Sequence, residues 1–311
     1  MNKSMSSSQQ AVLTGAVRGK IQWDAPLSAW TTYRIGGPAD ALVTLLDAVD
    51  LQAVLAFCRR ERVAWKVLGR GSNVLAPDEG FRGVVMILGD GFKKIRVNRK
   101  LDSHRVAVHA GAAVGMTRLA NWCRSEGLAG FEFAAGIPGS VGGGTVVNAG
   151  AWGRSMADVI DAIEITDELK REIVRAKNLT FRYRKCDCSE LEKNASVIIE
   201  VVLNLSPGDP QRIGVTMRDL QALRRDRQPQ GLPCAGSVFK NPIGASAGKL
   251  IDDAGLKGMR VGDAQVSETH ANFIVNCGTA SARDVQSLIA EIQRRVLNDS
   301  GIALEPEIEI L

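Results

Sequence analysis

The longest glycine-rich stretch of the chain is GIPGSVGGG at residues 136–144, and NAG follows it at 148–150. Six of the nine positions in this stretch are Gly or Pro. A loop with few Cβ atoms lets backbone amides approach phosphate oxygens closely. Two further clusters are Gly36-Gly37 and GRGSN at 69–73. Three such clusters favour a bound anionic ligand, and glycines that serve only in turns are the alternative.

The two longer loops match neither common nucleotide-binding motif. No Gly-Lys-Ser/Thr follows either loop, so a P-loop is excluded. The loop at 69–73 begins as GxG, but Val74 stands at the last glycine position of the Rossmann pattern. We therefore expect a large cofactor, with its pyrophosphate on one loop and its flat end on another.

The composition is that of a soluble globular protein. The 311 residues are 45% hydrophobic and 23% charged, and the net charge of +5 comes from interspersed acids and bases. Nothing in this distribution indicates nucleic-acid binding. The six cysteines show no CxxC spacing and there are three histidines, so no metal site is expected. No apolar run approaches the ~20 residues of a membrane span and MNKSMSSSQQ is no secretion signal, so a cytoplasmic location is expected.

Apolar spacing divides the chain into three blocks after a Ser- and Gln-rich segment, residues 1–19, that is expected to be disordered. The first block has strands at 41–46 and 63–68, with a helix between them capped by Asp47 or Asp50. The second block has a strand at 106–110, a helix at 116–123 and strands around 163–165 and at 197–205. The turn cluster SPGDP at 206–210 predicts a domain boundary.

The third block is predicted to contain two helices, at about 211–225 and 282–298. Ser281 and Asp284 have the spacing of a capping box, and Gly301 is placed to end the second helix. The final segment IALEPEIEIL, residues 302–311, resembles a strand. Glu305, Glu307 and Glu309 would then share one face, as catalytic carboxylates or as a solvated edge.

The segment GSVFKNP at 236–242 places a hydroxyl, an ammonium and an amide within five residues. Ser237 lacks a GxSxG elbow and a nearby His, which argues against a nucleophilic serine. A serine can instead donate a proton to a strongly basic carbanion. A plain surface turn is the alternative.

Arginines in two places suit anionic groups. Arg184, which ends LTFRYR, could bind a carboxylate through two hydrogen bonds, or could face solvent. Arg224, Arg225 and Arg227 could bind a diphosphate, or could form an exposed helix end, and the sequence does not choose among the three.

Taken together, these segments resemble the UDP-N-acetylenolpyruvoylglucosamine reductase family, also called UDP-N-acetylmuramate dehydrogenases. The matching stretches follow the family's order from residue 20 to the end: TTYRIGGPAD (31–40), LGRGSNVL (68–75), GFRGVV (80–85), GLAGFEFAAGIPGSVGGGTVVNAGAWG (127–153), FRYR (181–184), QPQGLPCAGSVFKNP (228–242), AGKLIDDAGLKG (247–258), VSETHANFIVN (266–276) and LEPEI (304–308). The chain resembles the shorter type II form, which lacks an inserted segment with a substrate-covering Tyr.

The resemblance implies an α+β fold of the vanillyl-alcohol-oxidase (PCMH) type. Two FAD-binding subdomains, 20–95 and 96–206, would follow the tail at 1–19. Residues 207–311 would form a C-terminal α+β substrate-binding domain. The family uses NADPH to reduce FAD, and the flavin then reduces the enolpyruvyl ether of UDP-N-acetylglucosamine-enolpyruvate to a lactyl ether. This is an early step of peptidoglycan synthesis, and a monomer is expected.

The family motifs assign roles to individual residues of this chain. Arg184, Ser237 and Glu307 match the catalytic residues, with Ser237 as the proton donor. Substrate contacts are expected from Tyr183, Arg225, Lys240 and Asn241. FAD contacts are expected from Arg70, Gly71, Ser72, Asn73, Gly136, Ile137, Pro138, Gly139, Ser140, Gly142, Asn148 and Ala149.

The departures from the family pattern are few, and none removes a catalytic group. Cys186 stands where the family usually has Ser or Thr, and Gly144 stands where it usually has Ala. Two other functions compete with this prediction. One is an FAD oxidoreductase of the same fold that acts on alcohols or lactones. The other is a nucleotide-binding module without catalysis, which predicts a purified protein without a yellow chromophore.

Overall fold

The computed structural model describes residues 4–98, 104–193 and 195–311. The chain folds into two compact units, each built from segments that are distant in the sequence. The first unit takes the residues up to Trp23, Ala41–Gly69 and Arg82–Ala222. The second takes Asp24–Asp40, Arg70–Phe81 and Leu223–Leu311. No helix within the described ranges is long and apolar enough to cross a lipid bilayer.

The first unit begins with a four-stranded sheet of order β1-β2-β5-β3, in which β3 and β5 are parallel. Its strands are β1 (Lys20–Pro26), β2 (Pro38–Leu45), β3 (Trp65–Val67) and β5 (Phe81–Leu88). Helix α2, Ala48–Glu61, connects β2 to β3, which confirms the predicted strand-helix-strand pattern. Asp47 is its cap, since its carboxylate accepts the N–H groups of Val49 and Asp50.

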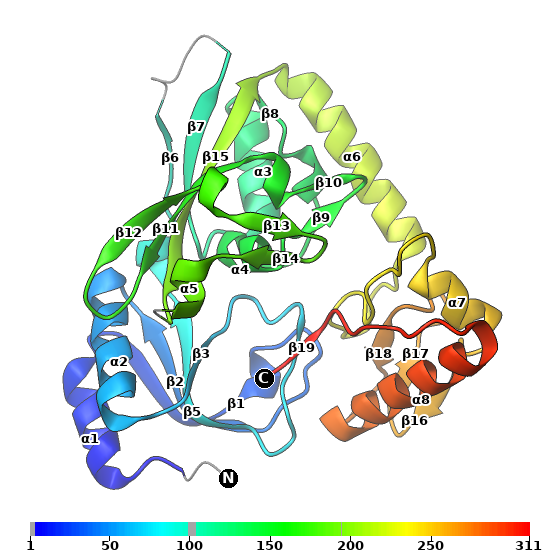
Figure 1. Ribbon diagram of the computed structural model, residues 1–311, viewed down its shortest axis with the longest axis horizontal. Coiled ribbons are helices and arrows are strands. Elements are labelled where there is room, and N and C mark those ends of the chain that lie inside the picture. The colour runs from blue at the N-terminus through cyan, green and yellow to red at the C-terminus, as the bar shows by residue number, and fades with distance from the viewer. Residues whose placement is uncertain (1–3, 99–103, 194) are drawn as a thin grey trace. The chain divides into compact units, whose positions relative to one another are not determined.

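Residues 7–16 form a helix, α1 (Ser7–Ala16), where the sequence predicts a disordered tail. The prediction is wrong for this stretch because Ser6 and Gln9 form a capping box and Leu13 is fully buried against α2. Gln9 also donates to the carbonyl of Glu61, the last residue of α2, at 3.4 Å. Figure 1 shows α1 beside α2.

The second sheet of this unit is antiparallel, with strand order β12-β11-β15-β7-β6, and β8 pairs with the end of β15. Its strands are β6 (Ile95–Asn98), β7 (Val106–Gly111), β8 (Leu128–Ala129), β11 (Ile160–Thr166), β12 (Arg171–Arg175) and β15 (Val197–Pro207). β15 is the strand predicted at 197–205, and it lies between β11 and β7. The side chains of its apolar run are buried on both faces, which explains the lack of a clear alternation.

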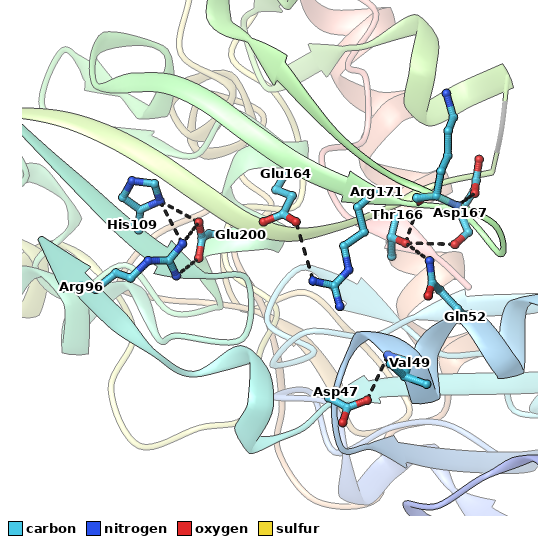
Figure 2. Close-up of polar contacts among 11 residues, drawn as sticks. Asp47, Val49, Gln52, Arg96, His109, Glu164, Thr166, Asp167, Arg171 and Glu200 are labelled. Carbon is cyan, nitrogen blue, oxygen red and sulfur yellow. Dashed lines mark hydrogen bonds and ion pairs between the residues drawn. The ribbon is translucent and has the colours of Figure 1, made fainter. Parts of the chain in front are cut away.

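Buried apolar side chains and a polar contact connect the two sheets of the first unit. Val197 and Ile199 of β15 reach the core around α2. The side-chain amide of Gln52, in α2, donates to Thr166 Oγ1 at the end of β11, and the two atoms are 3.0 Å apart. This contact is drawn in Figure 2. On the antiparallel sheet in the same view, Arg96 and His109 both contact the carboxylate of Glu200. The first unit is therefore one body with two sheets.

Further helices and two strand pairs complete the first unit, and the last of these helices continues past Ala222 into the second unit. They are α3 (Met116–Ser125), α4 (Val141–Val146), α5 (Ser189–Lys193) and α6 (Pro210–Arg227), with the two-stranded pairs β9 (Gly150–Ala151) with β10 (Arg154–Ser155) and β13 (Thr180–Arg182) with β14 (Lys185–Asp187). The turn cluster at 206–210 separates β15 from α6, but the compact unit continues across it to Ala222. Ile213 and Met217 of α6 are buried in the first unit's core, which explains this continuation. The division into domains at 95 and 206 stays a prediction.

The second unit has a three-stranded antiparallel sheet, β16-β17-β18, and α8 packs against it. A separate parallel pair joins β4 to β19. The elements are β4 (Val74–Leu75), α7 (Ala247–Asp253), β16 (Arg260–Val261), β17 (Ala264–Val266), β18 (Ile274–Asn276), α8 (Ala282–Ser300) and β19 (Glu309–Ile310). Ser281 and Asp284 form the predicted capping box of α8, and Gly301 ends the helix at φ +70°. Tyr33, Ile35 and Leu75 are part of this unit's core.

Candidate active site

The long glycine loop of the first unit leads into α4, and Ser140 caps that helix. Ser140 Oγ accepts the N–H of Gly143 at 3.3 Å. Upstream, Gly136 and Gly139 have φ values of +85° and +118°, a region that glycine enters without steric cost. Residues 136–140, all predicted FAD contacts, thus lead into α4 through two glycines in the left-handed region.

Two other glycines of this loop are required for close packing. A Cβ on Gly142 would lie 2.8 Å from Cβ of Ala112, and one on Gly144 would lie 3.1 Å from Sδ of Met116. The N–H of Gly142 is also bound, at 2.9 Å, to the carbonyl of Ala112. Part of the glycine pattern therefore serves packing, and the FAD contact of Gly142 stays a prediction.

Gly69 and the long glycine loop at 136–144 meet inside the first unit. Gly69, which begins GRGSN, lies so close to Ser140 that a Cβ on it would be 2.7 Å from Ser140 Oγ. Gly69 is exposed, whereas Ser140 is buried. Gly69 and Ser140, which come from two clusters that the sequence predicts to share one cofactor, are therefore neighbours.

Asn148, another predicted FAD contact, is buried and has the left-handed φ of +42°. Its amide nitrogen donates to the carbonyl of Arg182 at 3.0 Å, and its amide oxygen accepts the N–H of Ala157 at 3.0 Å. The side chain therefore links the glycine loop to the strand that precedes Arg184.

Arg184 and Tyr183 form the two-residue loop between β13 and β14. Arg184 has φ +59°, and such strain in a residue other than glycine is frequent at functional sites. Its Nη1 donates to the carbonyl of Gly150 at 3.1 Å, and its Cζ lies 5.1 Å from the ring centre of Tyr183. The guanidinium is thus held by the segment that follows the glycine loop, while Tyr183 is exposed.

Cys186, the departure from the family near Arg184, lies in β14 with its side chain buried. Burial raises the pKa of its thiol to about 12, so it stays protonated at neutral pH. A thiol is only a weak hydrogen-bond donor. Cys186 therefore replaces the family's hydroxyl with a group that mainly fills space.

The loop at 70–73 belongs to the second unit. Gly71 has φ +61°, and a Cβ on it would overlap the carbonyl oxygen of Trp30. Asn73 donates from its amide to the carbonyl of Glu307 at 3.1 Å, and its own carbonyl accepts the N–H of Glu309 at 2.9 Å. Two predicted site residues from opposite ends of the chain, Asn73 and Glu307, are thus in direct contact.

The segment after Ser237 pairs with the segment around Glu307. The N–H of Glu307 donates to the carbonyl of Val238 at 2.7 Å, and the N–H of Lys240 donates to the carbonyl of Glu305 at 2.9 Å. An antiparallel bridge between Phe239 and Pro306 lies between these bonds. The backbones that bear Ser237 and Glu307 are therefore neighbours in the second unit, and both side chains are half-buried.

The last residues form a shorter strand than the sequence predicts. Only Glu309–Ile310 pairs as β19, parallel to β4. Glu305 and Glu309 are exposed, whereas Glu307 is half-buried. The structure thus separates Glu307 from its two neighbours, which the alternation alone left equivalent.

Two of the predicted substrate-binding residues of the second unit, Lys240 and Asn241, already have partners. Lys240 forms an ion pair with Glu305. Asn241 accepts the N–H of Ala247 at 3.0 Å through its amide oxygen. Arg225 is exposed in the last turn of α6, where a cation also suits the helix dipole.

The sequence motifs did not identify one buried residue that binds the segment directly after Ser237. Asn272 makes two side-chain hydrogen bonds to Phe239. In the sequence it was noted only as part of a stretch that resembles the family. The available signal is an amide inside the apolar run ANFIV, because a polar group buried among apolar neighbours must be paired. The other missed residue is Thr32, whose hydroxyl lies 2.7 Å from the carbonyl of Cys234 and 3.1 Å from that of Gly71.

Two family models match this chain. The model for the C-terminal domain of UDP-N-acetylenolpyruvoylglucosamine reductase matches residues 228–311, and the model for an FAD binding domain matches residues 39–176. The second match includes the glycine loop and α4. The first includes the paired segments around Ser237 and Glu307.

Named relatives and a solved structure match nearly the whole chain. The UDP-N-acetylenolpyruvoylglucosamine reductase of Heliobacterium modesticaldum is 41% identical over 96% of this chain and 93% of its own length. That of Bacillus licheniformis is 40% identical over 94% of each. The crystal structure of the Thermus caldophilus enzyme is similar with a TM-score of 0.78 and 35% identity, over 94% of this chain and 98% of that one. The chain therefore belongs to the UDP-N-acetylenolpyruvoylglucosamine reductase family and has its α+β, vanillyl-alcohol-oxidase-type FAD-binding fold.

Proposed function

We propose that this protein uses NADPH to reduce the enolpyruvyl ether of UDP-N-acetylglucosamine-enolpyruvate to the lactyl ether of UDP-N-acetylmuramate, in the cytoplasmic synthesis of peptidoglycan precursors. The contact that carries the proposal is the hydrogen bonding among three distant stretches. Asn73, Val238 beside Ser237, and Glu307 are linked through their backbone groups and one amide. Residues 73, 237 and 307 all match the family's site motifs.

The glycine loops fit a bound dinucleotide such as FAD. Gly69 leaves open the space in front of Ser140 that a Cβ would fill. Gly71 can lie against the carbonyl oxygen of Trp30 because it has no Cβ. Bare backbone of this kind suits a pyrophosphate. FAD bound there and reduced by NADPH would supply the hydride taken up by the methylene carbon of the enolpyruvyl group.

Ser237 is the proposed proton donor. Once the methylene carbon has gained a hydride, the neighbouring carbon bears the electron pair of an enolate and must gain one proton to give the lactyl ether. A strongly basic carbon can take that proton from a serine hydroxyl, which is a weak acid. The hydroxyl of Ser237 is therefore the group that completes the addition, and it regains its proton from solvent.

Arg184 and Glu307 are proposed to act on the substrate carboxylate, into which negative charge spreads. A guanidinium can bind that carboxylate through two parallel hydrogen bonds. Glu307 would contribute as a hydrogen-bond donor in its protonated form. The contact of Arg184 with Gly150 and its left-handed backbone support a side chain whose orientation is fixed before substrate binds.

The substrate's diphosphate and sugar are assigned to Tyr183, Arg225, Lys240 and Asn241. Lys240 is paired with Glu305, so a phosphate would have to replace that carboxylate. The amide oxygen of Asn241 is bound to Ala247, so its NH₂ group is the part offered to substrate. Arg225 is the proposed diphosphate contact, and it is exposed, as is Arg227.

Stopped-flow absorbance of the flavin tests the proposal. NADPH should bleach the bound flavin, and the enolpyruvyl UDP-sugar should then restore its colour in the absence of oxygen. In Ser237→Ala, reduction by NADPH should keep its wild-type rate, while reoxidation by the substrate should slow by about 10²- to 10⁴-fold, the usual contribution of a positioned acid. Wild-type reoxidation in Ser237→Ala would overturn the assignment of Ser237. Reoxidation only by oxygen, with turnover of simple alcohols, would favour an oxidase.

A further inference from the structure

The backbone of residues 238–240, directly after Ser237, is hydrogen-bonded along both of its edges. Along one edge, Val238 and Lys240 pair with Glu307 and Glu305. Along the other edge the partner is a single residue, Asn272. Its carbonyl accepts the N–H of Val238 at 2.8 Å.

The side chain of Asn272 takes the place of a neighbouring strand. Its amide oxygen accepts the N–H of Phe239 at 2.9 Å, and its amide nitrogen donates to the carbonyl of Phe239 at 2.8 Å. A primary amide has the same donor and acceptor as a peptide group, so it can satisfy both backbone groups of one residue. Asn272 is 3% exposed, so water does not compete for these bonds.

Asn272 is itself held in a well-defined turn between β17 and β18. Its N–H donates to Nδ1 of His270 at 3.2 Å. The hydroxyl of Ser267 accepts the N–H groups of Thr269 and His270, and Phe273 donates to the carbonyl of His270. The side-chain amide that binds Phe239 therefore extends from a turn that is stabilised by its own hydrogen bonds.

We propose that Asn272 is a positioning residue that holds Ser237 in place for proton transfer. The proposal rests on the function proposed above, in which Ser237 protonates the substrate carbon. Proton transfer needs donor and acceptor within hydrogen-bond reach, and displacement by about 1 Å can cost on the order of 10²-fold in rate. Ser237 is two residues from Phe239, so freeing Phe239 loosens the segment that bears the hydroxyl.

Asn276 provides a matched control in the same unit. It is also an asparagine and 3% exposed. Its amide donates to the carbonyl of Tyr33 at 3.0 Å and accepts the N–H groups of Gly278 and Ala280. Changing Asn276 removes a similar set of buried bonds from a different part of the unit.

The first experiment compares Asn272→Ala and Asn276→Ala as FAD-loaded proteins. Asn272→Ala should slow reoxidation of the reduced flavin by the enolpyruvyl UDP-sugar by about 10- to 100-fold. It should leave the reduction by NADPH within about twofold of wild type, and Asn276→Ala should leave both steps within about twofold. Equal slowing of both half-reactions by Asn272→Ala, or equal slowing of reoxidation by both variants, would show a structural role only.

The second experiment is independent of turnover. Hydrogen exchange of the peptide covering residues 237–241, followed by mass spectrometry, should show about one additional fast amide in Asn272→Ala, because Phe239 N–H loses its acceptor. The same peptide in Asn276→Ala should exchange as in wild type. Unchanged exchange in Asn272→Ala would overturn the positioning role, whereas failure of wild-type reoxidation would overturn the proposed function itself.

A second variant covers the case in which Asn272→Ala does not fold. Asn272→Asp keeps the shape and the acceptor for Phe239 N–H, but when ionised it cannot donate to the Phe239 carbonyl. Reoxidation should therefore be slower than in wild type at pH 8 and should recover as the pH is lowered, since a protonated carboxyl can again donate. A pH profile parallel to that of wild type would contradict the proposal.

Discussion

Gly71 shows how one residue can be required both for the fold and for binding the predicted cofactor. The sequence predicts it as an FAD contact, and the structure adds a reason of its own, because Gly71 has a left-handed φ and lies against Trp30. Gly71→Ala should destabilise the protein by more than the ~1–3 kcal/mol of backbone strain alone and should lower FAD content. Thermal unfolding and the ratio of flavin to protein absorbance measure the two effects.

The matched control for that change is Gly231→Ala. Gly231 has φ +80°, and a Cβ on it would meet nothing within 4 Å. Gly231→Ala should therefore lose stability through backbone strain alone, with no steric overlap, and its FAD content should stay at the wild-type level. Equal losses in the two variants would mean that the contact with Trp30 contributes nothing.

His270, beside Asn272, predicts a pH dependence of stability. Burial lowers its pKa below the usual 6.5, so the folded state favours the neutral ring. As pH falls below about 6.5, the unfolded state binds a proton more readily, and the free energy of unfolding decreases. The neutral ring stabilises the fold, so the urea midpoint of wild type should exceed that of His270→Gln by less at pH 5.5 than at pH 8.

Side-chain partners are the part of the site that the sequence does not predict. Asn148 and Asn73 were both expected to contact FAD, yet the structure shows their amides bound to the carbonyls of Arg182 and Glu307. Which carbonyl an amide meets depends on strands that lie far apart in the chain. Local pattern therefore identifies such residues as important without giving their contacts.

Among the elements, the long and strongly periodic segments were predicted and the two-residue strands were not. Helices α2, α6 and α8 and strand β15 follow from apolar spacing and capping residues. Pairs such as β9 with β10 are two residues long, too short for any period to show. Likewise, Asp78 binds the first two N–H groups of α8 from a distant loop, which no local capping rule predicts.

Helix α1 shows how composition can mislead, and it gives a direct test. Its many Ser and Gln residues suggest disorder, but Leu13 is fully buried. Leu13→Ala should lower the free energy of unfolding by about 2–4 kcal/mol, as for other buried leucines. Val12→Ala, one position earlier and 39% exposed, should change it by less than about 0.5 kcal/mol. Chemical denaturation of both variants checks the helix, and equal values would contradict its packing.

For the whole molecule, the segment matched by the C-terminal family model is not the same as the second compact unit. The family model covers 228–311, but the second unit also needs Asp24–Asp40 and Arg70–Phe81. A fragment of residues 223–311 should therefore remain unfolded, because it lacks Tyr33, Ile35 and Leu75 from its core and β4 as the partner of β19. Circular dichroism and dispersion of amide NMR signals test this, with the full chain as the control, and a cooperative unfolding transition of the fragment would refute it.

The interleaved second unit also has a consequence for synthesis on the ribosome. Translation proceeds at roughly 5–20 residues per second, so the 141 residues between Phe81 and Leu223 take roughly 7–28 s to make. During that interval Tyr33, Ile35 and Leu75 have been made but their partners have not. The nascent chain thus leaves these apolar side chains without their partners, and we expect a chaperone to bind these stretches first.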